Sequence, residues 1–296
     1  MKTFKNSNQM KAFLKKEAAR LKFNFNNVYL TFVSRSFLER VASLQDDSII
    51  VKGSSAEMAY LGRSVRSITD IDIATVGSLD VNFSLINSLF GESDTDNFDF
   101  RLRKNCEETK TGIHKIFLEA DFDKIKQPLG IDYQDNYNRL IELERRVMPP
   151  LFEGDKAFEI YLPSFEEYLA EKMCIILESN KENVLNTRVK DFYDIYQLHG
   201  SLGYDPDKLS EYFAKMLKLR GKIKIEDAKT LMLDNEFVRK HKDIWDRTRD
   251  RYNFLDSDLT LLEAVFYTRA VLRERLQKNG IEMDDNISRQ YVIKKK

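Results

Sequence analysis

Apolar residues recur at helical spacing in the first 45 residues of the chain. Residues 7–21 carry one apolar stripe behind the capping residues Asn6 and Ser7, and this pattern predicts a helix. Residues 28–44 keep the same 3.6-residue period through aromatic and branched side chains, and they predict a second helix. We expect these aromatic side chains to belong to a core.

Shorter apolar runs follow and predict strands. One run, residues 49–51, enters the turn Gly53-Ser54, and a second run carries Asp70-Ile71-Asp72. Residues 98–102 alternate between apolar and polar, and residues 114–122 form the next expected strand, with a short helix expected over 84–89. These strands, with helices between and around them, predict a mixed β-sheet flanked by helices.

The second half of the chain has a helical pattern throughout. Pro149-Pro150 and the polar stretch 152–156 form the clearest boundary, and Ser164 with Glu167 makes a capping box for a helix that runs to about residue 177. Further helices are expected at about 187–198, 207–219, 225–233, 235–244 and 258–278. We therefore predict an α+β protein with a sheet domain over 1–150 and an α-helical domain over 151–296.

Composition limits the class of protein. The 296 residues are 42% hydrophobic and carry 48 basic and 48 acidic side chains, so the zero net charge disfavours general coating of nucleic acid but allows a local basic patch. Cys106 and Cys174 lack metal-type spacing, and we expect buried reduced thiols. Without a long apolar run or a signal-peptide pattern, we expect a cytoplasmic protein that does not enter a membrane.

One stretch combines a Gly-Ser turn with two closely spaced carboxylates. Asp70 and Asp72 point to the same side of a strand, where two carboxylates repel each other unless a cation lies between them. Mg²⁺ suits such oxygen ligands and normally brings substrate phosphates. The Gly53-Ser54 turn at a helix start offers N–H groups and a hydroxyl to a phosphate. An isolated Asp-x-Asp is usually a solvated strand edge, but this combination predicts a metal–nucleotide site.

Other carboxylates and a lysine extend this candidate site. Metal-assisted phosphoryl transfer usually needs a third carboxylate, and on the strand 114–122 we favour Glu119, between two apolar neighbours, over Asp121 near the strand end. Lys172 lies at the edge of the apolar stripe of its helix, from where it can reach a triphosphate. Asp191 and Asp194 lie together at the border of a later stripe, although acid–base pairs at such spacing often only support a helix.

The Gly-Ser and Asp-x-Asp segments resemble the signature of polymerase-beta-like nucleotidyltransferases. The whole set is similar to the abortive-infection nucleotidyltransferase toxins of the AbiEii/AbiGii family. The resemblance covers roughly residues 45 to 200 and is carried by Val51–Ser55, Arg66 with Thr69–Ile73, Ile116–Glu119, Ala170–Lys172 and Arg188–Ile195. Two departures are Gly53-Ser54-Ser55, where the family often has Gly-Gly, and Glu119, where it usually has Asp.

The resemblance implies roles for individual residues. The first domain would be a nucleotidyltransferase domain, and the helical domain would complete its active-site cleft. The nucleotide-binding residues would be Gly53, Ser54, Ser55, Arg66 and Lys172. The catalytic residues would be Asp70, Asp72, Glu119, Lys172, Asp191 and Asp194, of which Asp70, Asp72 and Glu119 would bind the metal.

The resemblance also implies transfer of a nucleotide from an NTP, dependent on Mg²⁺ or Mn²⁺, with release of pyrophosphate. The acceptor would be RNA, first of all the acceptor end of tRNA, and a cognate antitoxin would be a partner. Transfer to a small molecule or a protein side chain, and a non-catalytic partner-binding role, stay open. If the acceptor is RNA, we expect a basic rim around the site. The sequence offers three candidate clusters: a first near the site, Arg63, Arg66, Arg101, Arg103 and Lys104; a second, Lys215, Lys218, Arg220, Lys222 and Lys224; and the tail Lys294–Lys296.

Overall fold

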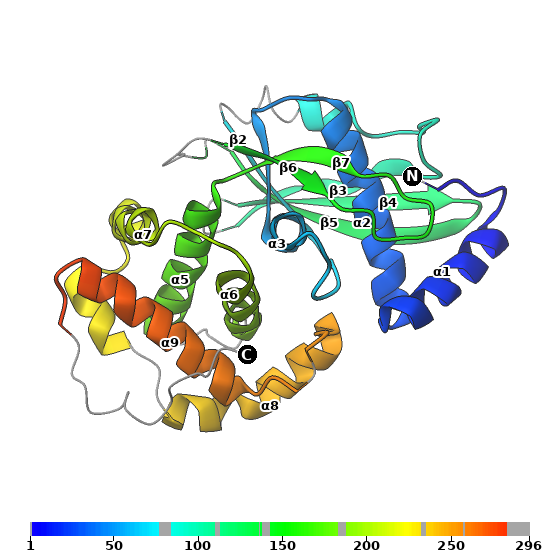
Figure 1. The fold of residues 1–296 in the computed structure, drawn as a ribbon. Helices are drawn as coiled ribbons and strands as arrows, with labels where there is room; N and C mark the ends of the chain where they lie inside the picture. The colour runs from blue at the N-terminus through cyan, green and yellow to red at the C-terminus, as the bar shows by residue number, and fades with distance from the viewer. Residues whose placement is uncertain are drawn as a thin grey trace. The chain divides into compact units, whose positions relative to one another are not determined.

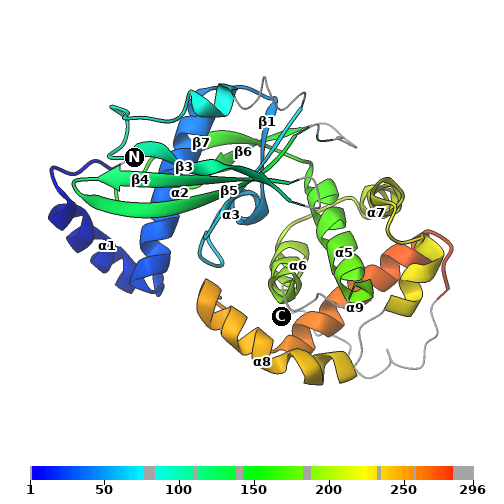
Figure 2. The same cartoon turned by 180° about the vertical axis from the view of Figure 1, so that it is seen from behind.

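The computed structural model describes residues 2–76, 84–109, 113–135, 137, 143–182, 188–231, 235–256 and 258–282 (Figure 1, Figure 2). The chain forms two compact units. The sheet unit is Met1–Pro163 with Tyr252–Leu255, and the helical unit is Ser164–Arg251 with Asp256–Lys296. The predicted α+β class is confirmed. The division follows Pro163, somewhat later than the expected boundary after residue 150, because the last strand belongs to the sheet unit.

The main sheet of the sheet unit has five strands in the order β1-β2-β5-β4-β3. Neighbouring strands are antiparallel except β2 and β5, which are parallel. A separate two-stranded antiparallel sheet contains β6 and β7. The strands are β1 (Ile49–Lys52), β2 (Ile71–Thr75), β3 (Asp99–Glu108), β4 (His114–Phe122), β5 (Ile125–Gln134), β6 (Glu144–Met148) and β7 (Phe158–Leu162). The sequence pattern does not predict β5, β6 or β7.

Strand β5 escapes prediction because its middle contains two residues that disfavour strands. Pro128 and Gly130 are both poor strand formers. Pro128 is tolerated because β2 pairs only with Ile131–Gln134, so β5 is unpaired on one side at Pro128 among the described strands. The tight turn from β4 uses Asp123 and Lys124, both at positive φ, as a two-residue hairpin turn requires.

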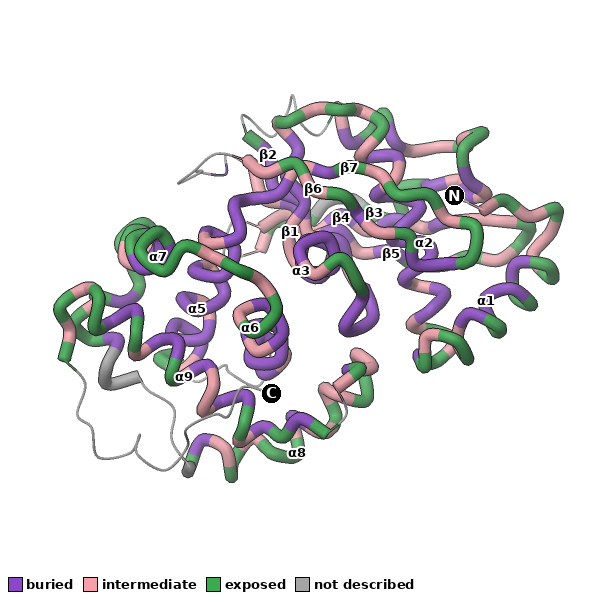
Figure 3. The backbone as a smooth tube through the Cα atoms, in the orientation of Figure 1, coloured by how far each residue is buried: buried purple, intermediate pink, exposed green. Residues whose placement is uncertain are grey.

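Helices α1 (Ser7–Leu21) and α2 (Phe25–Ser43) contribute aromatic side chains to the core of the sheet unit. Asn6 and Asn24 cap these helices by accepting hydrogen bonds from Gln9 N and Asn27 N. Phe32 and Phe37 of α2 are buried, and their rings contact Phe98 and Phe100. Buried positions run along both α2 and the sheet strands (Figure 3). The expected aromatic core is therefore present.

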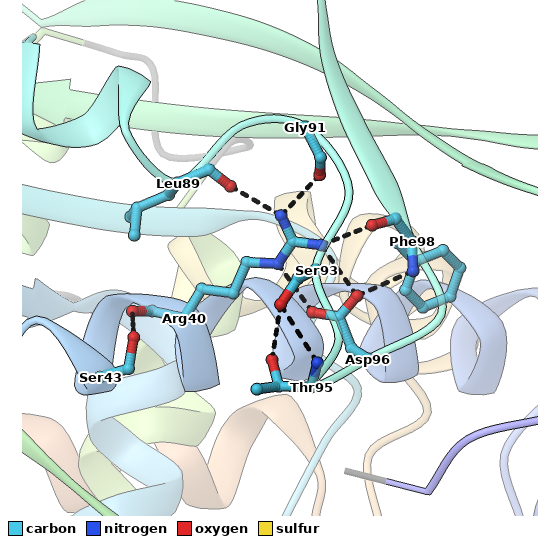
Figure 4. Close-up of polar contacts among 8 residues, drawn as sticks. All are labelled: Arg40, Ser43, Leu89, Gly91, Ser93, Thr95, Asp96 and Phe98. Atoms are coloured by element: carbon cyan, nitrogen blue, oxygen red, sulfur yellow. Dashed lines mark hydrogen bonds and ion pairs between the residues drawn. The ribbon is translucent and has the colours of Figure 1, made fainter.

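A buried arginine on α2 organises the segment between residues 89 and 98 (Figure 4). The Arg40 guanidinium donates to both carboxylate oxygens of Asp96, at 2.7 and 2.9 Å. It also donates to the carbonyls of Leu89 and Gly91, each at 2.8 Å, and to the carbonyl of Phe98. One side chain thus satisfies three backbone acceptors and one buried carboxylate, and it fixes this segment against α2.

We expect Arg40→Met to lower the free energy of unfolding of the sheet unit by about 3–5 kcal/mol, because it leaves the Asp96 carboxylate buried without its partner. Urea unfolding measures this change. The control is Arg145→Met, which breaks the ion pair between Arg145 and Glu159. These two side chains are 52% and 48% exposed, so this variant should lower the free energy of unfolding by less than about 1 kcal/mol. Equal effects of the two variants would contradict the role given to Arg40.

The helical unit contains α5 (Phe165–Lys181), α6 (Val189–Ser201), α7 (Pro206–Arg220), the 3₁₀ helix η2 (Ile225–Leu231), α8 (Asn235–Tyr252) and α9 (Leu261–Lys278). The last residue of α8 belongs to the sheet unit. Ser164 caps α5 by accepting from Glu167 N, as predicted, and Thr260 caps α9. Helix α5 contacts α6 and α7, and α9 contacts α6 and α7 as well (Figure 1). The described helices lie where the sequence pattern predicts them, except that α8 extends to Tyr252, well beyond the expected end near residue 244.

Cys174 lies on α5 as a free thiol with no exposed surface. Burial raises the pKa of this thiol well above its ordinary value, so Cys174 is a neutral core residue rather than a nucleophile. The side chain of Cys106 lies outside the described residues. None of the described helices has both the length and the apolar character that crossing a bilayer requires.

Candidate functional site

The Gly-Ser turn and the second aspartate of Asp-x-Asp touch each other in the sheet unit. The antiparallel pairing of β1 and β2 places Lys52 opposite Asp72, so the residue after Lys52 lies beside the aspartate. Gly53 has φ +59°, and a Cβ at this position would lie 1.8 Å from Asp72 Oδ2. The carboxylate thus occupies the space that any other side chain at position 53 would need. Only glycine allows this contact.

Helix α3 (Gly53–Leu61) begins at this contact. Its first N–H groups donate no hydrogen bond to the side chain of the capping residue, because Lys52 has no acceptor atom there. The hydroxyls of Ser54 and Ser55 are buried, and neither Oγ has a hydrogen-bond partner within the described ranges. Buried polar atoms without a partner are uncommon and costly. A phosphate at the N-terminus of α3 would supply acceptors for these donors.

Asp70 directly precedes β2, Asp72 is the second residue of β2, and both are half-buried. The two carboxylates are therefore separated by one residue at the beginning of this strand. Asp70 accepts a hydrogen bond from Thr69 Oγ1 at 3.2 Å. Across the part of the chain that the structure describes, no three Asp, Glu, His or Cys side chains converge on one metal position. Two carboxylates nevertheless fit Mg²⁺, which usually takes one or two protein carboxylates and fills its other positions with phosphate and water.

The sheet register brings a carboxylate other than Glu119 beside Asp72. Asp72 of β2 is paired with Asp132 of the neighbouring strand β5. Glu119 lies one strand further away on β4, paired with Pro128, which is about 13 Å along β5 from Asp132. Glu119 binds Lys126 at 2.6 Å, and Asp121 lies 4.0 Å from the same ammonium group. The sequence pattern missed Asp132 because it missed β5; the alternation of Leu129, Ile131 and Tyr133 is the signal that could have found it.

Charged side chains form one row across this face of the sheet. Successive pairings place Lys52, Asp72, Asp132, Lys115 and Glu107 side by side on β1, β2, β5, β4 and β3. Lys115 Nζ lies 2.7 Å from Asp132 Oδ1, and Lys52 Nζ lies 4.3 Å from the ring centroid of Tyr137. The two central carboxylates thus have a lysine on each side, which offsets their mutual repulsion.

Arg66 is buried beside helix α3. Its side chain is 2% exposed and lies 3.3 Å from the buried carboxylate of Glu57 on α3. Its guanidinium also lies 5.7 Å from the ring centroid of Tyr252. Arg66 thus links α3, through Glu57, to the segment that leads into β2.

Lys172, Asp191 and Asp194 converge within the helical unit. Lys172 Nζ of α5 lies 2.6 Å from Asp194 Oδ2 and 3.1 Å from Asp191 Oδ1, both on α6. The three side chains are at most 9% exposed. Asp191 Oδ2 makes no hydrogen bond with the described residues, and Arg188 Nη1 lies 3.9 Å from it. The three predicted residues therefore form one buried ion cluster between α5 and α6.

The two aspartates of this cluster should differ in their effect on stability. We expect Asp194→Ala to lower the free energy of unfolding of the helical unit by about 3 kcal/mol. Asp194 is fully buried and makes the shorter of the two bonds to Lys172, so its removal leaves the ammonium group without its closer partner. Asp191→Ala should cost about 1 kcal/mol, since its bond is longer and one oxygen is unused. Urea unfolding of both variants tests the order, and a larger loss for Asp191→Ala would contradict it.

Several candidates for a basic rim are already engaged by acidic partners. Arg220 binds Glu178 through two bonds of 2.7 Å each, and Lys222 binds Glu182 at 3.0 Å. Lys215 is paired with Glu211 in the same helix. This second cluster is thus largely neutralised, whereas Lys218 and Lys224 are exposed. The tail Lys294–Lys296 lies outside the described residues.

One family model and several solved structures match this chain. The family model described as "Nucleotidyl transferase AbiEii toxin, Type IV TA system" matches residues 36–272. JHP933 from Helicobacter pylori, known from a crystal structure, shares 15% sequence identity with this chain. The two structures superpose with a TM-score of 0.43, and the match covers 85% of this chain and 92% of that chain. An antigenic nucleotidyltransferase-like protein from Paracoccidioides brasiliensis is 14% identical, with a TM-score of 0.35 over 70% and 91%. No curated protein sequence matches this chain.

Proposed function

This chain belongs to the AbiEii family of nucleotidyl transferase toxins of type IV toxin–antitoxin systems, and on that premise we propose that it transfers a nucleotide from an NTP to RNA. The acceptor end of tRNA is the proposed acceptor, and a cognate antitoxin is the proposed partner in the cytoplasm. The observation that carries the proposal is the contact of Asp72 with Gly53 at the start of α3. It joins a carboxylate for a metal to a helix N-terminus for a phosphate.

The triphosphate would bind at the N-terminus of α3. Ser54 and Ser55 would donate their hydroxyls, which lack other acceptors among the described residues, and the first N–H groups of α3 would donate to the same phosphates. Asp70 and Asp72 would hold Mg²⁺ or Mn²⁺ together with the phosphate oxygens. The bound metal would offset the phosphate charge and favour the departure of pyrophosphate.

The reaction joins the acceptor hydroxyl oxygen to the α-phosphorus, and the bond between the α-phosphorus and the bridging oxygen breaks. The hydroxyl proton must leave, and a carboxylate close to Asp72 is suited to receive it. We favour Asp132 for this role because it is paired with Asp72 and lies 2.7 Å from Lys115, which can keep it oriented. Glu119, the choice of the sequence pattern, remains the alternative. Lys172 would contact the triphosphate, with Asp191 and Asp194 positioning its ammonium group.

Labelling with an α-³²P-NTP tests this function. The purified protein is incubated with each NTP, Mg²⁺ and total RNA, and the label is measured in RNA, protein and small-molecule fractions. We expect label in RNA of tRNA size, lost when Mg²⁺ is chelated. Label in the protein or small-molecule fraction would identify a different acceptor. Mg²⁺-independent label, or no label with any NTP, would overturn the proposal.

A further inference from the structure

The face of the main sheet that carries Asp70 and Asp72 continues across β5, β4 and β3. Gly130 of β5 lies beside Asp70, because the next residues, Ile71 and Ile131, are paired. Gly130 is paired in turn with Phe117 of β4, and Phe117 with Lys104 of β3. This row lies next to the row that contains Asp72, Asp132 and Lys115. Whatever binds on it lies beside the candidate metal ligands.

Gly130 leaves an opening in this row. A Cβ at Gly130 would meet no other atom of the described chain within 4 Å, and its φ lies outside the left-handed region. The glycine is therefore not needed for backbone conformation, and the space above it is free. Phe117 of β4 is the residue paired with Gly130, and Asp132 lies two residues further along β5. A flat group placed above Gly130 would contact the aromatic ring and stay close to both carboxylate-bearing strands.

One lysine ammonium group lies over the Phe117 ring, and a second lysine is two residues away on the same strand. Lys104 Nζ lies 3.9 Å from the centroid of the half-buried Phe117 ring, and Lys115 is two residues from Phe117 on the same face. The Lys104 and Lys115 side chains are 49% and 43% exposed, and their acidic partners are Glu107 and Asp132. Solvated ion pairs of this kind are weak, and a lysine ammonium group has three N–H donors, so each lysine can bind a phosphate while it keeps its carboxylate partner. We call Lys104, Lys115, Phe117 and Gly130 the Phe117 platform.

We propose that the Phe117 platform binds the single-stranded 3′ end of the acceptor RNA. The terminal base lies over Gly130 against the Phe117 ring, and the backbone phosphates contact Lys104 and Lys115. Base stacking on an aromatic side chain, combined with nearby cations, is how sheet surfaces hold single strands. This inference rests on the proposed function, and it explains why the row beside Asp70 contains an unobstructed glycine.

Binding of a 5′-fluorescein-labelled octaribonucleotide with a free 3′ hydroxyl tests the platform by fluorescence anisotropy. We expect Gly130→Val, which fills the space, and Phe117→Ala, which removes the ring, each to weaken binding about tenfold. Phe117→Trp should keep the wild-type affinity. Gln127→Val is the matched control, because it adds the same side chain to β5 on the opposite face without changing charge. Its affinity should stay within about twofold of the wild type.

A second readout separates binding of RNA from binding of the NTP. Calorimetric titration with Mg²⁺ and an NTP analogue that has a non-cleavable αβ bridge should give the same affinity for Gly130→Val and the wild type. Near-wild-type RNA binding by both platform variants, an equal loss in Gln127→Val, or no RNA binding by the wild type would overturn the platform. If the RNA affinities follow the expected order but no NTP labels any fraction, the platform stands and the proposed transfer fails.

Discussion

Asp72→Asn is expected to lower the rate of nucleotide transfer by about a thousandfold, which corresponds to about 4 kcal/mol of transition-state stabilisation. The amide keeps the size of the side chain, but it loses the negative charge that would hold a divalent cation against the phosphates. The measurement is the initial rate of label incorporation at saturating NTP and Mg²⁺. A loss of less than about tenfold would show that Asp72 is not a metal ligand.

The control for this change is Asp94→Asn. Asp94 is exposed in the segment that precedes β3, and it makes none of the contacts described for the site. Asp94→Asn removes one negative charge, as Asp72→Asn does, so an effect that depends only on net charge would appear in both variants. We expect Asp94→Asn to transfer at the wild-type rate. Circular dichroism of both variants checks that the fold is unchanged.

Gly53→Ala is expected to lower the transfer rate by about a hundredfold and the free energy of unfolding by about 1–3 kcal/mol. A methyl group at this position would lie 1.8 Å from Asp72 Oδ2, so the carboxylate must leave its place against the turn. Positive φ adds a further cost for any residue with a Cβ. Transfer assays and urea unfolding of the same preparation measure the two effects.

Gly62→Ala separates these two causes. Gly62 has φ +65° at the end of α3, but a Cβ there would meet nothing within 4 Å. This variant therefore carries the backbone cost alone, about 1 kcal/mol, and should transfer normally. If Gly62→Ala lost as much activity as Gly53→Ala, the contact between Gly53 and Asp72 would not be what the reaction needs.

Much of the fold follows from local patterns in the sequence. The helix predicted over residues 7–21 is α1, and the capping box at Ser164 and Glu167 starts α5. Helix periodicity and capping depend on residues three or four positions apart, so a single sequence reveals them. The strands β6 and β7 are short and partly charged, and β5 contains Pro128 and Gly130. Such strands are stabilised by their neighbours rather than by their own composition.

In the candidate site, too, some features follow from local sequence and others depend on contacts between distant segments. Gly53, Ser54, Asp70 and Asp72 were predicted from local spacing, and the structure brings Gly53 and Asp72 into contact. The roles of these residues remain proposals that the variants above can test. Lys172, Asp191 and Asp194 were grouped from their positions on two helix stripes, and they form one buried ion cluster.

Local sequence patterns are enough to predict the helices, the α+β class and the Gly-Ser and Asp-x-Asp segments, because each depends on neighbours within a few positions. Contacts between distant segments place Asp132 beside Asp72, pair Glu119 with Lys126, and bury Arg66 against Glu57. Pairing of β2 with β5 joins segments about 60 residues apart in the chain, and burial of the apolar face that the two strands share sets that register.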